Sequence, residues 1–202
     1  MPQRCLYCGK VIDSYTFRSF FLKEDELCPS CRKKMQVKRK LIGLGDFKVE
    51  SFFEYDSIFK SLLLQFKDCH DEALKSVFLY DLNDYLNVRY FGYQLLFVPS
   101  SERKRKERGF DHLEEIFSEV KLKRVKGLKM KKDLCQEGMD LDRRKRMTDN
   151  YIYEGKTLQK VLIVDDMMTT GSSLRGVYNC IKVHSKKIKV LSLAYKSITL
   201  HY

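Results

Sequence analysis

Apolar residues recur along the chain at two spacings, one typical of helices and one typical of buried strands. In residues 56–67 the apolar positions share one face at helical spacing, and Asp56 is suited to cap the start of that helix. That face consists of Ile58, Phe59, Leu62, Leu63 and Phe66. Further helices are predicted over residues 71–86, 111–120 and 172–184.

Three short apolar runs predict β-strands. One covers residues 94–98 and stops at Pro99, another covers the mostly β-branched residues 161–164, and the third covers residues 188–195. Strands that alternate with helices predict an α/β protein with a mainly parallel sheet flanked by helices. Ligands of such sheets bind at the carboxyl ends of strands, so the segments after the first two runs are where we expect a site.

Two cysteine pairs lie near the start of the chain, Cys5 with Cys8 and Cys28 with Cys31. Two residues between thiolates let both reach one metal ion, and two such pairs complete a tetrahedral four-cysteine zinc site. A redox pair at Cys28 and Cys31 is the competing interpretation, but no strand pattern precedes it. A closed four-thiolate site is structural, and it supplies folding energy that a segment of about 40 residues cannot obtain from apolar burial. We therefore predict a zinc-ribbon module in residues 1–43.

The most informative segment follows the aliphatic run at residues 161–164. It contains, in order, Asp165, Asp166, Thr169, Thr170, Gly171, Ser172 and Ser173, and then enters a predicted helix. Backbone N–H groups at the start of that helix can bind a phosphate, and Gly171 lets the backbone approach it closely. The two carboxylates would accept hydrogen bonds from ribose hydroxyls. A solvent-facing loop is the alternative, but strand, acid pair, Thr-Thr-Gly-Ser and helix together favour a phosphorylated ribose.

Two further segments are strongly basic. Arg103, Arg105 and Arg108 follow Pro99 in an expected loop, where guanidinium groups suit bidentate contacts with pyrophosphate or a nucleic-acid backbone. A solvated charged surface is the alternative. Residues 121–150 are also basic, and contact with pyrophosphate, binding of single-stranded DNA and simple solubilising charge stay open as explanations.

Composition sets the class of protein. With 202 residues, of which 44% are hydrophobic, the chain suits one folded domain and a small module. It has no apolar run of about 18 residues and no apolar leader, so we expect no membrane insertion, no secretion and a cytoplasmic location. A net charge of +12 favours polyanionic partners such as nucleic acid or phosphorylated metabolites.

The segment from Asp165 to Ser173 resembles the phosphate-binding motif of type I phosphoribosyltransferases. Together with the cysteine pairs, it resembles the ComF family of competence-associated proteins, which join a four-cysteine zinc module to a phosphoribosyltransferase domain. Residues 108–110, Arg-Gly-Phe, agree with that family, whereas Asp111 and His112 stand where it has Asn-Gln. More loosely spaced counterparts of family residues are Gln136, Leu141, Arg146 and Asn150.

The resemblance implies a type I phosphoribosyltransferase fold for residues 44–202. It implies that phosphoribosyl pyrophosphate binds with its 5′-phosphate on residues 169–173 and with Mg²⁺ bridging ribose and pyrophosphate oxygens. Asp165 and Asp166 would be the catalytic pair that holds the sugar and stabilises the positive charge at its anomeric carbon. The arginines of residues 103–108 would meet the pyrophosphate.

The role that the resemblance implies is assistance to single-stranded DNA uptake during natural transformation, beside a membrane-associated helicase partner. A metabolic transferase acting on a base or amine and a non-catalytic sensor of phosphoribosyl pyrophosphate are the alternatives. The sequence contains no recognisable nucleobase pocket, which favours the competence protein or the sensor. Turnover stays open.

Overall fold

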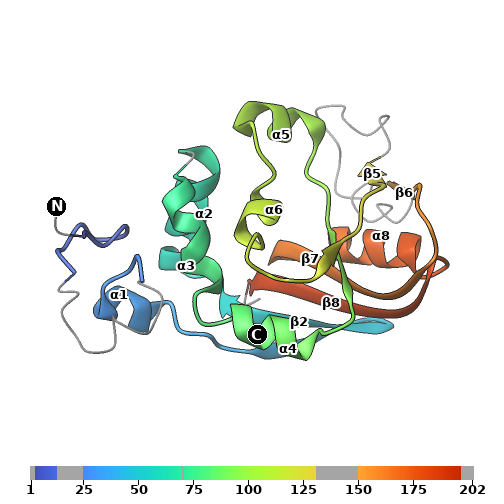
Figure 1. Ribbon diagram of the computed structural model, residues 1–202, viewed down its shortest axis with the longest axis horizontal. Coiled ribbons are helices and arrows are strands. Elements are labelled where there is room, and N and C mark those ends of the chain that lie inside the picture. Colours follow the sequence, from blue (N-terminus) through green and yellow to red (C-terminus); the bar gives the residue numbers. More distant parts are fainter. Residues whose placement is uncertain (1–2, 13–24, 70, 131–149, 197–202) are drawn as a thin grey trace, which may run out of the picture.

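The computed structural model describes residues 3–12, 25–69, 71–130 and 150–196. Its main sheet has six strands in the order β1-β2-β8-β7-β3-β4 (Figure 1). Only β1 runs antiparallel to its neighbour, and β2, β8, β7, β3 and β4 are parallel. The predicted α/β class with a mainly parallel sheet flanked by helices is confirmed.

The strands are β1 (Lys40–Leu44), β2 (Phe47–Glu54), β3 (Gln94–Phe97), β4 (Lys123–Arg124), β5 (Leu128–Met130), β6 (Tyr151–Tyr153), β7 (Leu158–Met168) and β8 (Ser185–Tyr195). The helices are α1 (Pro29–Lys34), α2 (Ser57–Asp68), the 3₁₀ helix η1 (Glu72–Leu74), α3 (Lys75–Leu79), α4 (Asn83–Arg89), α5 (Glu102–Arg108), α6 (His112–Ile116) and α8 (Ser172–Ile181). Strands β5 and β6 form a separate antiparallel ribbon. Within the described residues, no helix has the length and apolar character needed to span a membrane.

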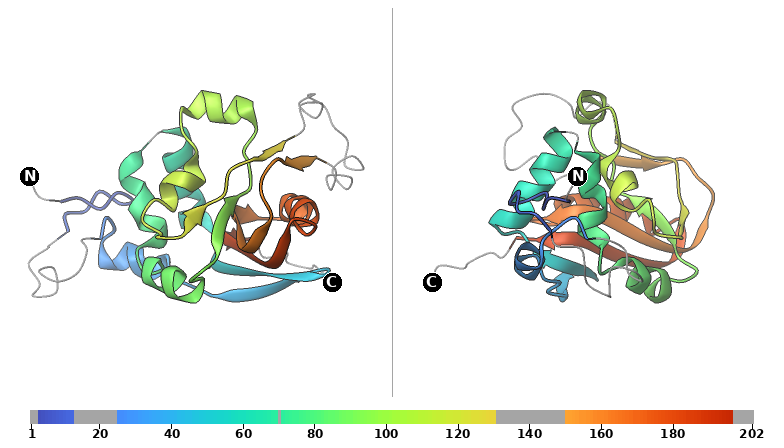
Figure 2. Two further views of the ribbon diagram at one scale, coloured as in Figure 1. Left: turned by 45° about the vertical axis from the view of Figure 1, so that its right-hand side comes forward. Right: turned by 60° about the vertical axis from the view of Figure 1, so that its left-hand side comes forward.

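The central strand β7 divides the hydrophobic core into two clusters because its successive side chains point to opposite faces of the sheet. Val161 and Ile163 pack with α8 and β6 in one cluster. Leu162 and Val164 pack with α2, α3, α4 and α6 in the other. For the described residues, Figures 1 and 2 accordingly show α8 on one side of the sheet and α2, α3, α4 and α6 on the other.

The predicted helices differ in how well they agree with the structure. Helix α2 matches its prediction, and the Asp56 side chain caps it by accepting a hydrogen bond from the backbone N–H of Phe59 at 2.9 Å. The single helix predicted over residues 71–86 is wrong, because the chain there forms η1, α3 and α4. Residues 77–79 are all buried, which one face of a straight helix cannot achieve. Helix α6 is also shorter than the predicted 111–120.

The cysteine-containing segment packs on the face of the sheet that is covered by α2, α3, α4 and α6, which we call the helical side. Leu27, Met35 and three of the cysteines belong to the same hydrophobic cluster as α2 and α3. Arg32 of α1 binds both carboxylate oxygens of Asp25, at 2.7 and 2.6 Å, and donates to the carbonyl of Val77 in α3 at 3.0 Å. The predicted domain boundary between residues 43 and 44 would fall within β1 and stays a prediction.

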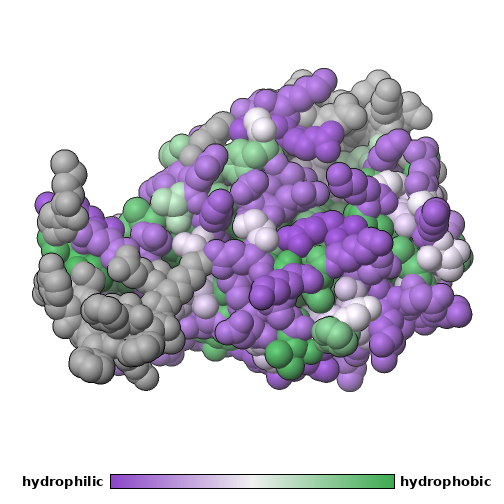
Figure 3. All heavy atoms as spheres, in the orientation of Figure 1, coloured by the Kyte–Doolittle hydropathy of each residue, from purple (hydrophilic) through white to green (hydrophobic). Residues whose placement is uncertain are grey.

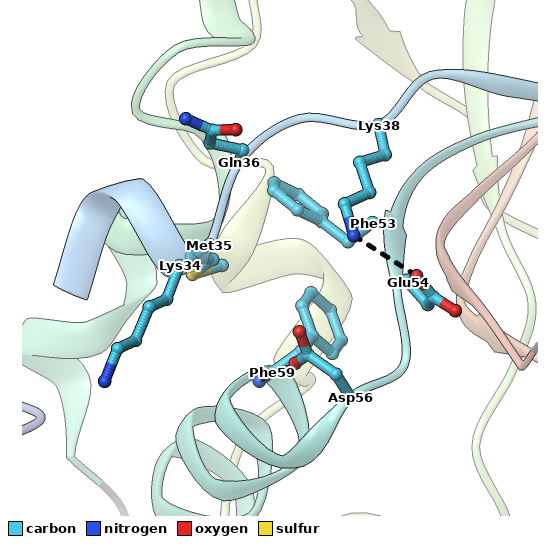
Figure 4. A pocket seen from close by; sticks show the side chains of 8 residues that line it. All are labelled: Lys34, Met35, Gln36, Lys38, Phe53, Glu54, Asp56 and Phe59. Carbon is cyan, nitrogen blue, oxygen red and sulfur yellow. Dashed lines mark hydrogen bonds and ion pairs between the residues drawn. The ribbon is translucent and has the colours of Figure 1, made fainter. Parts of the chain in front are cut away.

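A small hollow lies where this segment meets the sheet (Figure 4). It is bounded by Lys34, Met35, Gln36, Lys38, Phe53, Glu54, Asp56 and Phe59. Lys38 and Glu54 form an ion pair across it at 3.3 Å. With a volume of about 10 Å³ it has room for roughly one water molecule, so it is a packing gap between the segment and the sheet.

Candidate functional site

The four N-terminal cysteines come together as predicted. Their Sγ atoms all lie within 4.8 Å of one another, and those of Cys8 and Cys28 are 3.7 Å apart. Zinc–sulfur bonds of about 2.3 Å place the sulfurs of a tetrahedral site roughly 3.8 Å apart, so the cluster fits one zinc ion. Burial raises the pKa of the Cys5 thiol, but hydrogen bonds from backbone N–H groups outweigh it and bring that pKa down to about 7. Burial raises the pKa of Cys31.

The acid pair lies within β7, not after it, which corrects the strand end predicted at Val164. Strand β8 is equally long and pairs with β7 as far as Met168, so the strand continues through both acids. Strand β3, by contrast, pairs with β7 only up to Val164. Asp165 and Asp166 therefore lie at the carboxyl edge of the sheet, where one neighbour of β7 has already ended.

A glycine turn joins β7 to α8. Gly171 has a φ of 71°, and an added Cβ would lie 2.4 Å from the Leu44 side chain, so both backbone conformation and space require glycine here. As the N-cap residue it offers no side-chain acceptor to the first N–H groups of α8. Thr169 and Thr170 are exposed, and the Thr170 and Ser172 hydroxyls lie 2.5 Å apart. Such a turn can bind an anion through its N–H groups and hydroxyls.

Asp165 shares its surroundings with residues of the α8 side. Its Oδ1 accepts a hydrogen bond from the backbone N–H of Asp166 at 2.9 Å. Burial raises the pKa of Asp165 to about 7, and the positive charge of Lys67 limits the rise. Tyr151 of β6 is buried, and its side chain hydrogen-bonds with Ser173. Burial raises the pKa of Tyr151, and the charge of Asp165 raises it further.

Asp166 is paired with two residues from the opposite side of the sheet. Its Oδ2 accepts from Nζ of Lys67, at the end of α2, and lies 2.9 Å from Nε2 of His112, at the start of α6. Lys67 and Asp166 are each 14% exposed, and His112 is 5% exposed. Sequence reasoning assigned no role to Lys67, His112 or Tyr151. Lys67 and His112 are 99 and 54 residues from Asp166 along the chain, so no local pattern links them to it.

The basic segment after Pro99 is a helix, which corrects the predicted loop. Glu, Lys and Arg all favour helices, and the basic last turn of α5 suits the helix dipole. Arg103, Arg105 and Arg108 therefore all belong to a helix; the side chain of Arg105 is exposed and that of Arg108 is half-buried. Hydrophilic residues dominate the face in Figure 3, including the region of α5. A pyrophosphate contact by these arginines stays a prediction.

The looser family counterparts divide between two groups. Asn150 is buried beside β6. Gln136, Leu141 and Arg146 lie outside the described residues, as does most of the basic stretch predicted at residues 121–150.

Fold and site define an α/β protein with an acid pair and a glycine turn at the carboxyl edge of a parallel sheet, joined to a four-cysteine site suited to zinc. A hypoxanthine phosphoribosyltransferase from Staphylococcus aureus is similar, with a TM-score of 0.41 and 12% identity over 65% of this chain and 71% of that one. A hypoxanthine-guanine phosphoribosyltransferase from Bacillus anthracis gives 0.40 and 13% over 65% and 78%. No protein-family model and no curated protein matches the chain.

Proposed function

We propose that the chain is a phosphoribosyltransferase-like protein that binds a phosphorylated ribose, such as phosphoribosyl pyrophosphate, at the turn between β7 and α8. The observation that carries this proposal is the position of Asp165 and Asp166 at the strand end that leads into the glycine turn. Carboxylates beside a glycine turn at a helix N-terminus suit a ligand with hydroxyls at one end and a phosphate at the other.

The turn would hold the 5′-phosphate. The first N–H groups of α8 point out of the helix start, where the dipole favours an anion. Thr169, Thr170, Ser172 and Ser173 would add hydroxyl donors around it. Gly171 would let the phosphate approach the backbone, since any side chain there would meet Leu44.

The acid pair would hold the ribose. Carboxylates that accept from the sugar hydroxyls also stabilise the positive charge that builds at the anomeric carbon when pyrophosphate leaves. Mg²⁺ carried by the ligand would supply charge neutralisation for the leaving pyrophosphate. Arg103, Arg105 and Arg108 would bind that leaving group by charge-assisted hydrogen bonds.

For the wider role, the ComF resemblance supports assistance to DNA uptake in a competent cell, with single-stranded DNA and a helicase as partners. The basic composition is compatible with DNA binding. A metabolic transferase and a non-catalytic sensor remain alternatives, and they differ from each other in whether pyrophosphate is released.

The decisive experiment is calorimetric titration of phosphoribosyl pyrophosphate into the double variant Asp165→Asn, Asp166→Asn. Loss of charge-assisted hydrogen bonds from the sugar should weaken binding on the order of 100-fold. The matched control is Asp81→Asn with Asp84→Asn, which removes the same charge from exposed positions around α4 and should bind as the wild type does. Unchanged affinity in the Asp165/Asp166 variant would refute the site.

A second measurement separates the alternatives. Pyrophosphate release is followed with a panel of bases, amines and single-stranded DNA as acceptors. Release by the wild type and not by the Asp165/Asp166 variant would identify a transferase, and the active acceptor would show whether it is metabolic. Tight binding without release would favour the sensor or a competence protein that uses the ligand as a signal.

A further inference from the structure

Lys67 and His112 both contact the Asp166 carboxylate of the acid pair. The proposed function assigns neither of them a contact with the ligand. Both donors converge on the same oxygen, Oδ2 of Asp166. All three side chains are largely buried, so water competes little with these hydrogen bonds. Hydrogen bonds to a carboxylate in such surroundings fix its orientation as well as its charge.

An aromatic contact sets the positions of the two donors. Phe66, which precedes Lys67, is fully buried, and Phe110, two residues before His112, packs edge-on against it with ring centroids 5.4 Å apart. The end of α2 and the start of α6 are thus joined by an apolar contact beside the polar one. This packing of Phe66 against Phe110 therefore positions Lys67 and His112 beside Asp166.

The backbone before His112 is also fixed. Gly109 has a φ of 77°, which turns the chain out of α5. Asp111 caps α6 by accepting hydrogen bonds from the N–H groups of Leu113 at 3.1 Å and Glu114 at 3.4 Å. His112 is consequently the first residue of α6, and its ring is carried inward to Asp166.

The partner decides which ring nitrogen of His112 carries the proton. An ionised carboxylate only accepts hydrogen bonds, so Nε2 of His112 is the donor toward Oδ2 of Asp166. With Lys67 on the same atom, Oδ2 already has two donors. Among the described residues, both recorded donors lie on Oδ2, so Oδ1 is the Asp166 oxygen that we assign to the ligand.

We propose that His112 is a positioning residue for ribose recognition, which acts with Lys67 by fixing the Asp166 carboxylate so that Oδ1 meets a sugar hydroxyl. This proposal rests on the proposed function of the site. It assigns the two acids different tasks. Asp165 meets the sugar from the other face of β7, where burial raises its pKa and the charge of Lys67 limits that rise. Asp166 meets the sugar as a carboxylate whose orientation is fixed by Lys67 and His112.

The test pairs two variants with two ligands. His112→Phe removes the donor and keeps a planar ring, whereas His112→Gln keeps an N–H donor of similar reach. Ribose 5-phosphate offers both hydroxyls to the acid pair, and 2,3-dideoxyribose 5-phosphate keeps the phosphate but lacks them. Affinities of the intact chain and its variants are measured by calorimetry.

His112→Phe should weaken the binding of ribose 5-phosphate about ten-fold, because the charge-assisted hydrogen bond that orients Asp166 is lost. It should change the affinity for the dideoxy sugar less than about two-fold, and His112→Gln should retain most of the ribose affinity. Such a cycle isolates the coupling between His112 and the hydroxyls, since a general structural defect would weaken both ligands alike.

Equal losses for both ligands would overturn the positioning role, as would an unchanged ribose affinity in His112→Phe. If His112→Phe fails to fold, His112→Gln decides, and a ten-fold ribose loss in that variant would overturn the role. A wild-type chain that binds neither sugar phosphate would instead refute the proposed function, and the positioning role with it.

Discussion

Among the described residues, one face of the sheet is covered by helix α8, which follows directly from β7 and packs back on it, whereas the other face is covered by the cysteine segment and by α2, α3, α4 and α6. The two faces meet at Asp165 and Asp166. Because strand side chains alternate, Asp165 belongs to the α8 side with Tyr151, and Asp166 belongs to the helical side with Lys67. A sequence motif presents these acids as equivalent, but the fold gives them different surroundings.

The difference has consequences for stability as well as for binding. On the α8 side, Asp165, Gly171 and Ser173 belong to one continuous segment from β7 into α8, so a change there should act mainly on the turn. On the opposite side of the sheet, three of the four clustered cysteines share one hydrophobic cluster with α2, α3 and α6. Loss of a cysteine should therefore also disturb the residues that hold Asp166. We expect the largest loss of stability from changes on that side of the sheet.

Removal of the metal should destabilise the chain more than any other change considered. Cys31→Ser deletes a buried ligand and lowers the affinity for zinc, which would supply folding energy to its segment. We expect a loss of at least about 3 kcal/mol in the free energy of unfolding, measured by chemical denaturation, and fewer than one bound zinc per chain by elemental analysis.

The matched control for this prediction is Cys69→Ser. Cys69 is an exposed thiol at the C-terminus of α2 and is not one of the four clustered cysteines, so both stability and zinc content should stay unchanged. A metal-free wild-type chain with unaltered stability would contradict the metal's structural role and would leave the two faces alike.

The largest effect on the α8 side should come from Gly171→Ala. An alanine would be strained at a φ of 71°, and its Cβ would lie 2.4 Å from Leu44. We expect a loss of about 2 kcal/mol in the free energy of unfolding, together with weaker phosphate binding. Adding Leu44→Ala should not restore the loss fully, because it relieves the contact and not the backbone strain.

Gly43→Ala is the control for the turn. Gly43 has no atoms within 4 Å of an added Cβ, so its replacement should change stability little. Equal losses at Gly43 and Gly171 would mean that the turn has no special demand for glycine.

The two faces of the sheet also differ in how much of their structure could be predicted from the sequence. The βαβ unit of β7, α8 and β8 was predicted because its strands and helix are encoded by local periodicity. The length of β7 could not be predicted from periodicity, because its last residues adopt strand structure through their pairing with β8. The partners of Asp166 could not be predicted, since Lys67 and His112 reach it only through tertiary packing.

Stability should also depend on pH through Asp165. Burial raises the pKa of Asp165 from 3.8 to about 7 in the folded chain, so the folded state holds a proton that the unfolded state loses between those values. Stability from this group is complete below about pH 4 and falls as the pH rises to about 7. The Asp165→Asn variant has no proton to lose at this position. Its free energy of unfolding should exceed that of the wild type by ~2 kcal/mol at pH 8.5, a value reduced for partial exposure to water.

Denaturation at pH 4 and pH 8.5 tests this dependence. The two proteins should differ little at the lower pH, so the difference between them serves as an internal control for any effect of the amide itself. A constant difference at both pH values would show that Asp165 titrates as an ordinary surface acid, and the contrast between the two carboxylates would then rest on Asp166 alone.

The smallest predicted effect concerns the hydroxyl of Tyr151, which pairs with Ser173 at the start of α8. Tyr151→Phe should cost about 1 kcal/mol of stability and weaken binding of a ribose phosphate several-fold, because Ser173 loses the partner that orients its hydroxyl. Tyr153→Phe is a demanding control, since Tyr153 lies on the same ribbon and donates to the carbonyl of Lys156 at 3.0 Å. It should lose similar stability and keep its affinity. If both variants keep their affinity, the α8 side holds the turn in shape without orienting a ligand, and recognition would depend on the helical side.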